Sequence, residues 1–153
     1  MRQGGITLIE LMVAIAVLAM IATIAIPSFA GLMREQRLVH ATNDLLAAVN
    51  LARSEAIKRG EETRMCAVPD CAGLDWSLGW QLQDRSQAML YSWQTANSGV
   101  RITSTQARVE FDGMGRLSSS ATLELAMEES SRQITIGRSG LATAERASNG
   151  TGS

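Results

Sequence analysis

The sequence predicts an α+β fold in which a long N-terminal helix packs on a β-rich C-terminal domain. Three observations support this class. Residues 11–26 form an apolar run interrupted only by Thr23, apolar residues then recur every three or four positions as far as Ala56, and beyond Gly60 apolar and polar residues alternate. The three-to-four spacing is typical of a helix with one buried face, whereas alternation is typical of half-buried strands.

The apolar run defines the first half of the predicted helix. Counted across Glu10 and Pro27 it covers residues 6–29, and about 20 apolar residues are enough to cross a bilayer. We therefore expect residues 6–29 to be a transmembrane segment. Pro27 cannot donate a backbone hydrogen bond and clashes with the preceding turn, so the helix should bend or loosen there.

The second half, residues 30–60, is predicted to be amphipathic. Its apolar stripe consists of Leu38, Ala41, Leu45, Ala48, Ala52 and Ala56. Asn43, Asn50, Ser54 and Lys58 fall on the opposite face. Gly60 stands where a C-terminal cap belongs, so the helix should end there.

The β-rich domain is expected to cover residues 61–143. Turn residues separate seven candidate strands, at residues 64–68, 80–83, 89–93, 100–103, 109–111, 121–127 and 133–136. Residues 144–153 are small and polar without any periodicity, and we expect them to be a disordered tail.

Glu10 is an exception inside the apolar stretch. A charged side chain at the centre of a membrane helix costs about 2.5 to 3.5 kcal/mol on insertion scales. Glu10 should therefore have a partner that compensates its charge.

The N-terminus contains a short basic leader, MRQGG at residues 1–5, followed by TLIEL at residues 7–11. This arrangement resembles the prepilins of the type IV pilin class. The resemblance implies that a prepilin peptidase cleaves after Gly5 and that the new terminus, Ile6, is N-methylated. Ile6 departs from the Phe that is usual at this position.

The same resemblance implies roles for Glu10 and Pro27 in assembly. Cleavage creates an amine one helical turn from Glu10. In a filament, the resemblance implies that the Glu10 carboxylate meets the amine of an adjacent subunit and sets the axial register. The alternative is that Glu10 only reaches toward the lipid surface.

Three internal segments narrow the class: ARSEAIKRG at residues 52–60, DWSLGW at 75–80 and VEFDGMGR at 109–116. Together they resemble the GspH/FimT family. This implies a pilin-like minor subunit, anchored in the bacterial inner membrane by a single pass with its C-terminal domain in the periplasm. Its partners would be other pilins or pseudopilins and an inner-membrane assembly platform. The sequence favours a minor pilin of a type IV pilus, with a minor pseudopilin of type II secretion as the alternative.

Cys66 and Cys71 enclose Pro69 and Asp70, which form turns readily, so the two thiols could approach each other. An oxidising periplasm favours a disulfide between them. Two buried free thiols are the alternative. A metal site needs more ligands, and the only histidine, His40, lies on the helix.

No catalytic constellation emerges from the sequence, so we expect neither an enzyme nor a cofactor. DNA binding is a further alternative, because some members of the family that the chain resembles are DNA receptors with a Gly-Arg-x-Arg run. Here Gly137 and Arg138 match, but Gly140 replaces the second Arg. From Arg101 onward six Arg are balanced by six Asp or Glu, which disfavours binding to phosphates.

The leader generates a direct prediction. Because the resemblance places the cleavage site after Gly5, mature protein purified from membranes should begin at Ile6 and carry one added methyl group at its N-terminus. Intact-mass spectrometry of the full chain measures both changes. A mature protein that still begins at Met1 would contradict the prediction.

Overall fold

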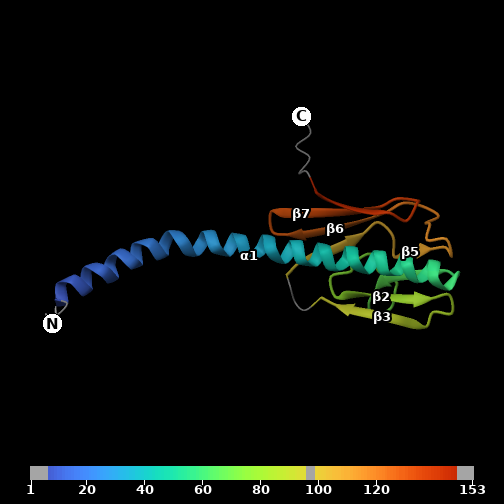
Figure 1. Cartoon of the computed structure of the whole chain (residues 1–153), viewed down its shortest axis with the longest axis horizontal. Helices are drawn as coiled ribbons and strands as arrows, with labels where there is room; N and C mark the ends of the chain where they lie inside the picture. Colours follow the sequence, from blue (N-terminus) through green and yellow to red (C-terminus); the bar gives the residue numbers. More distant parts are fainter. Residues whose placement is uncertain (1–6, 96–98, 148–153) are drawn as a thin grey trace, which may run out of the picture. The chain divides into compact units, whose positions relative to one another are not determined.

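The computed structural model describes residues 7–95 and 99–147, without the side chains of residues 24–28 and 30. The chain divides into two compact units, Met1–Glu35 and Gln36–Ser153. One helix, α1 (Leu8–Arg59), and eight strands make up the regular structure of the described residues (Figure 1). The predicted α+β class, with a long N-terminal helix and a β-rich remainder, is confirmed.

The part of α1 in the second unit buries the stripe that the sequence predicts. Leu38, Ala41, Leu45, Ala48, Ala52 and Ala56 are all at most 8% exposed. The residues expected on the opposite face, Asn43, Asn50, Ser54 and Lys58, are exposed. The helix ends at Arg59, immediately before Gly60, as expected from the capping position.

The strands form two antiparallel sheets. The first has the order β3-β2-β1-β5 and consists of β1 (Thr63–Ala67), β2 (Gly79–Asp84), β3 (Met89–Gln94) and β5 (Arg108–Phe111). The second has the order β4-β6-β7-β8 and consists of β4 (Arg101–Ser104), β6 (Ala121–Met127), β7 (Ser130–Ile136) and β8 (Ala142–Arg146).

One hydrophobic core joins the helix to both sheets. It contains the stripe of α1 together with Met65, Trp80 and Leu82 of the first sheet and Ile102, Leu123, Leu125, Ile134 and Ile136 of the second. Buried and exposed residues alternate in β4 and β5, as expected for strands with one face on the core, whereas β1 and β2 are buried at most positions.

Seven strands lie within three residues of their predicted bounds, but the last strand was not predicted. Residues 144–146, assigned above to a disordered tail, belong to β8 and pair with residues 132–134 of β7. The tail prediction is wrong for these residues, because their pairing comes from the neighbouring strand and not from an apolar pattern of their own. Residues 148–153 lie outside the described residues.

Within the described part of the chain, no helix combines the length and the apolar character that are needed to cross a membrane.

Candidate functional site

Thr7 caps the first turn of α1. The backbone N–H of Glu10 donates to the Thr7 side-chain oxygen at 3.3 Å and to the Thr7 carbonyl at 3.1 Å. This satisfies one of the amides that every helix start leaves unpaired. A Thr followed three residues later by Glu is the capping-box pattern, a signal for this helix start that the sequence analysis missed.

The Glu10 side chain is exposed. Among residues 7–95 and 99–147, no Arg, Lys or His forms an ion pair with its carboxylate. The carboxylate therefore remains available for a cation from outside these residues. Gly5 and Ile6, the predicted processing site, lie outside the described residues.

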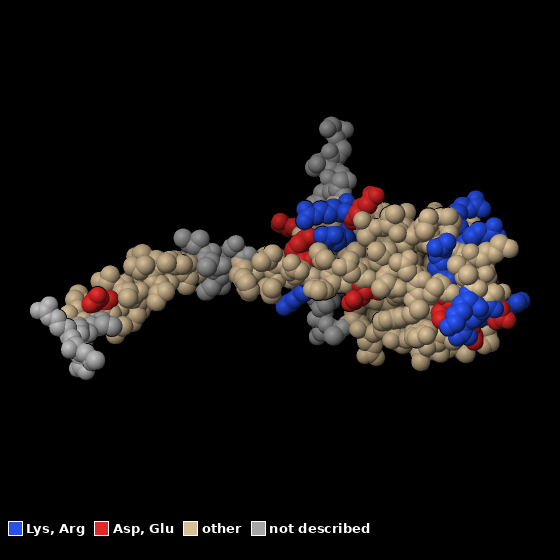
Figure 2. Space-filling model, viewed as in Figure 1, with Lys and Arg blue, Asp and Glu red and all other residues tan. Residues whose placement is uncertain are grey.

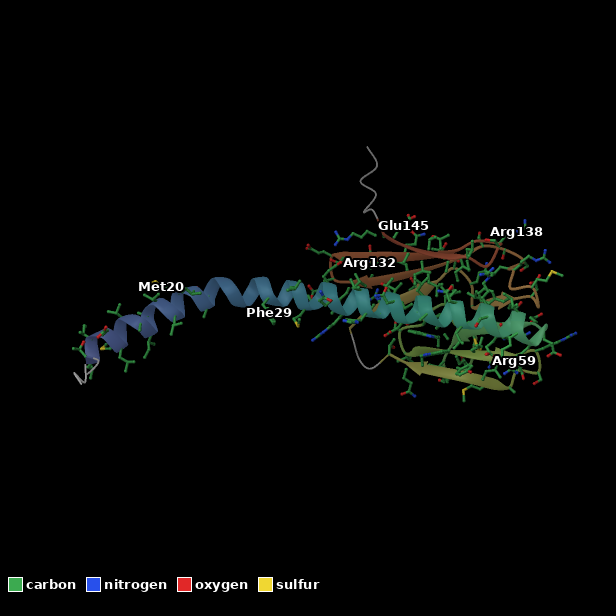
Figure 3. The ribbon with its side chains drawn as sticks, viewed as in Figure 1. Met20, Phe29, Arg59, Arg132, Arg138 and Glu145 are labelled. Carbon is green, nitrogen blue, oxygen red and sulfur yellow. A yellow bond between two sulfur atoms is a disulfide. The ribbon has the colours of Figure 1, made fainter. Side chains whose placement is uncertain are left out.

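Large apolar side chains next to Glu10 are exposed. Leu8 is 77% exposed, Ile9 66% and Met12 59%. Figure 3 shows Met20 and Phe29 extending away from the helix in the same unit. Helix α1 continues through position 27. The Pro27 side chain is not among those that the structure describes, so the role of Pro27 in assembly stays a prediction.

The segments that resemble the GspH/FimT family lie at joints within the second unit. In DWSLGW, the backbone N–H of Trp76 donates to the Ile102 carbonyl in the second sheet at 2.8 Å, whereas Trp80 belongs to β2 in the first sheet. Both indole rings are buried, at 0% and 2% exposure. This segment therefore connects the two sheets through the core.

The other two segments meet at the end of α1, in a contact that we call the helix-end joint. It consists of Arg53 and Ile57 of the helix, of Gly60 directly after it, and of Gly113, Gly115 and Gly140 from two turns. Arg53 Nε donates to the Gly115 carbonyl at 3.1 Å. A Cβ atom at Gly115 would lie 2.7 Å from Ile57 Cδ1, and one at Gly113 would lie 2.5 Å from the Gly60 carbonyl oxygen.

Asp112 holds the first of these turns. Its Oδ1 atom accepts hydrogen bonds from the backbone N–H groups of Arg116, at 2.8 Å, and Met114, at 2.9 Å. The bond from the Arg116 amide is the main cause that keeps the pKa of Asp112 below its usual value. The ionised carboxylate therefore stabilises the turn that carries Gly113 and Gly115.

A surface groove of ≈ 610 Å³ lies beside this joint, lined by Arg116, Arg138, Glu62, Glu110 and Asp112 among others. Figure 2 shows basic and acidic side chains mixed at this end of the unit, and Figure 3 labels Arg138 and Arg59 there. The two cations and three carboxylates give no excess of positive charge that would attract a polyanion.

The position that has the second Arg in DNA receptors is occupied by Gly140. Its φ is +78°, and a Cβ atom there would lie 1.9 Å from the Gly115 carbonyl oxygen. An arginine cannot replace it without displacing the turn.

Cys66 and Cys71 are joined in a disulfide, with their Cα atoms 4.9 Å apart. Gln81 Nε2 donates to Cys71 Sγ at 3.1 Å, and both cysteines are buried. Within the described residues, no cluster of three His, Cys, Asp or Glu side chains could hold a metal ion.

Profiles of known families match two parts of this chain. The profile of the family described as type II transport protein GspH matches residues 41–140. The chain belongs to the GspH family. The prokaryotic N-terminal methylation motif matches residues 1–26, which contain the leader, Thr7 and Glu10. No curated protein sequence matches the chain significantly.

Two crystal structures of the type IV minor pilin FimU from Pseudomonas aeruginosa strain PAO1 resemble this GspH-family chain in fold. The form in space group P21 has a TM-score of 0.63 at 21% identity and covers 72% of this chain and 90% of its own. The P65 form has a TM-score of 0.61 at 21% identity, covering 71% and 92%. The pilin-like fold predicted from the sequence is thus confirmed.

The helix-end joint predicts that alanine destabilises the protein at Gly140 but not at Gly137. Gly140→Ala should lower the free energy of unfolding by about 2 kcal/mol or more, since Ala in a left-handed conformation is strained and its Cβ meets the Gly115 carbonyl. Gly137→Ala is the matched control, because the nearest atoms to a Cβ there are 3.8 Å away, and it should change stability by no more than about 0.5 kcal/mol.

Urea unfolding of the full chain in detergent, followed by tryptophan fluorescence, measures both values. Equal stability of the two variants would contradict this account of the joint.

Proposed function

We propose that this GspH-family chain is a minor pilin of a type IV pilus, incorporated into the filament or its initiating complex. The observation that carries the proposal is the uncovered apolar start of α1, in which Glu10 is the only charged residue between Thr7 and Met33. A helix of this kind requires an apolar environment and one cation, and a bundle of similar helices supplies both. The methylation motif and the FimU-like fold support the same role.

The proposal includes processing before assembly. A prepilin peptidase cleaves after Gly5, and the new amine of Ile6 is methylated. Until assembly, the subunit is held in the inner membrane through residues 6–29, with the β-rich unit in the periplasm. The sequence run and its exposed side chains support this anchoring, because about 25 cal/mol is gained for each Å² of apolar surface that leaves water.

In the filament, the Glu10 carboxylate pairs with the N-terminal amine of an adjacent subunit. The pairing supplies the counter-ion that the described residues do not, and it avoids the cost of two isolated charges among apolar helices. Because a pair forms at only one axial offset, it also sets the register between neighbours. Other pilins and an inner-membrane assembly platform are the partners in this scheme.

A minor pseudopilin of type II secretion is the second candidate, and the description of the matching family favours it. Both roles use the same leader, Glu10 and Pro27, so the contacts within one subunit do not separate them. In either role the work is structural, with neither catalysis nor a cofactor. We do not extend the proposal to DNA binding, since the groove beside Arg138 is mixed in charge and Gly140 excludes the second Arg.

Substitution of Glu10 tests the proposed pairing. Glu10→Val should leave the protein in the membrane but lower its incorporation into filaments about tenfold or more, because the amine of the adjacent subunit loses its counter-ion. An uncompensated charge among apolar helices costs about 2.5 to 3.5 kcal/mol, and about 1.4 kcal/mol corresponds to a tenfold change. Glu10→Asp, which keeps the charge, is the control and should recover part of the incorporation. Immunoblots of sheared filaments and of membranes measure the two pools, and normal incorporation of Glu10→Val would refute the pairing.

Deletion of the chain distinguishes a role in a type IV pilus from a role in type II secretion. Deletion of the chain should reduce surface piliation while exoprotein secretion stays normal, because a pilus subunit serves only the filament. Filament counts by electron microscopy and a separate assay of secreted enzymes provide the readouts. Loss of secretion with normal piliation would instead assign the chain to type II secretion.

A further inference from the structure

Strand β3 forms one free edge of the first sheet. In the described residues it pairs with β2 on one side only, and the sheet order places it at the end (Figure 1). A free edge presents unpaired backbone N–H and C=O groups to which another extended chain can bind.

The register identifies the residues that present these groups. Val68 N–H donates to the Gly79 carbonyl at 3.2 Å, so Gly79 faces β1. Because residues of a strand face alternate neighbours, Gln81 also faces β1, and Trp80 between them faces β3. The residues of β3 opposite Gln81 and Gly79 are Ser92 and Gln94. Their backbone groups therefore point to the free edge.

The side chains beside this edge are aromatic and only partly covered. Tyr91 lies opposite Leu82 and Trp93 opposite Trp80, so these four side chains share the core face of the sheet. Leu82 and Trp80 are 0% and 2% exposed, whereas Tyr91 is 44% exposed. The rings of Tyr91 and Trp93 are 5.8 Å apart. The apolar layer of the core thus continues to the edge and ends there uncovered.

The other edge strands carry charges that β3 lacks. β4 contains Arg101, β5 contains Arg108 and Glu110, and β8 contains Glu145 and Arg146, while residues 89–94 contain none. Charges on edge strands oppose pairing with other chains. Of the four edges in the described sheets, β3 is therefore the one open to an added strand.

We propose that the edge of β3 binds an extended, uncharged strand of another pilin-like subunit. The added strand hydrogen-bonds to the backbone of Ser92 and Gln94 and places an apolar side chain beside Tyr91, which extends the core layer by one strand. A second copy of this chain fits less well, because two β3 edges would pair about a two-fold axis and close the assembly, whereas a filament needs open, heterologous contacts. The inference rests on the proposed function, which supplies such subunits as neighbours.

Proline at an outward-facing position tests the inference. Ser92→Pro removes an N–H group that points away from β2, so the β2–β3 pairing is kept while the added strand loses a hydrogen bond and meets the proline ring. Ser92→Thr is the matched control, because it keeps the N–H group and suits a strand. Gln94→Pro, at the second outward position and the strand end, repeats the test where any effect on folding is smallest.

The full chain is co-expressed pairwise with each pilin-like subunit of its host and purified in detergent through a tag. At least one subunit should bind the wild-type chain and Ser92→Thr within about twofold of each other, while both proline variants bind it about tenfold less or weaker. Tryptophan fluorescence compares the folds.

Undiminished binding by folded proline variants would overturn the inference, and so would pairing with a second copy alone. Either result leaves the proposed function intact if wild-type chain enters filaments. Absence of the wild-type chain from filaments would instead count against the proposed function.

Discussion

Both sheets depend on one helical stripe to complete their core. Ala48, Ala52 and Ala56 are at most 2% exposed, and they lie in one buried cluster with residues of both sheets. The apolar face of a sheet must be buried against another element, and here both sheets bury theirs in one core with the helix. Trp76 and Trp80 belong to the same buried cluster.

The two units differ in how far they bury the apolar surface of their helix. Gln36–Ser153 buries the apolar face of its helix within the chain, whereas the described part of the helix in Met1–Glu35 leaves large apolar side chains exposed. A helix that is apolar around its circumference needs surroundings other than water. Thr7 stabilises the start of this helix locally, because its side-chain oxygen accepts a hydrogen bond from the backbone N–H of Glu10.

The sequence reveals those features that depend on local pattern. The stripe of α1 follows from a three-to-four spacing. Two strands follow from alternation at residues 121–127 and 133–136, and five others from short runs separated by turn residues. β8 could not be found in this way, because Ala142 and Ala144 are small and the strand exists through its pairing with β7. The helix-end joint was also hidden, since it depends on contacts among distant segments that share no local pattern. The Thr7 cap, by contrast, was readable from the spacing of Thr7 and Glu10 and was overlooked.

The helix-end joint can form only after segments far apart in the sequence have been synthesised. A helix forms from local contacts within about a microsecond, whereas contacts between distant segments must first overcome the entropy of closing a long loop. Arg53 contacts Gly115, which lies 62 residues away, and the joint is complete only when Gly140 has reached both. Since synthesis proceeds from the N-terminus, the end of α1 cannot make these contacts until Gly140 has been synthesised. The most C-terminal turn of the joint therefore contacts a helix that precedes it by more than 80 residues, since 140 − 53 = 87.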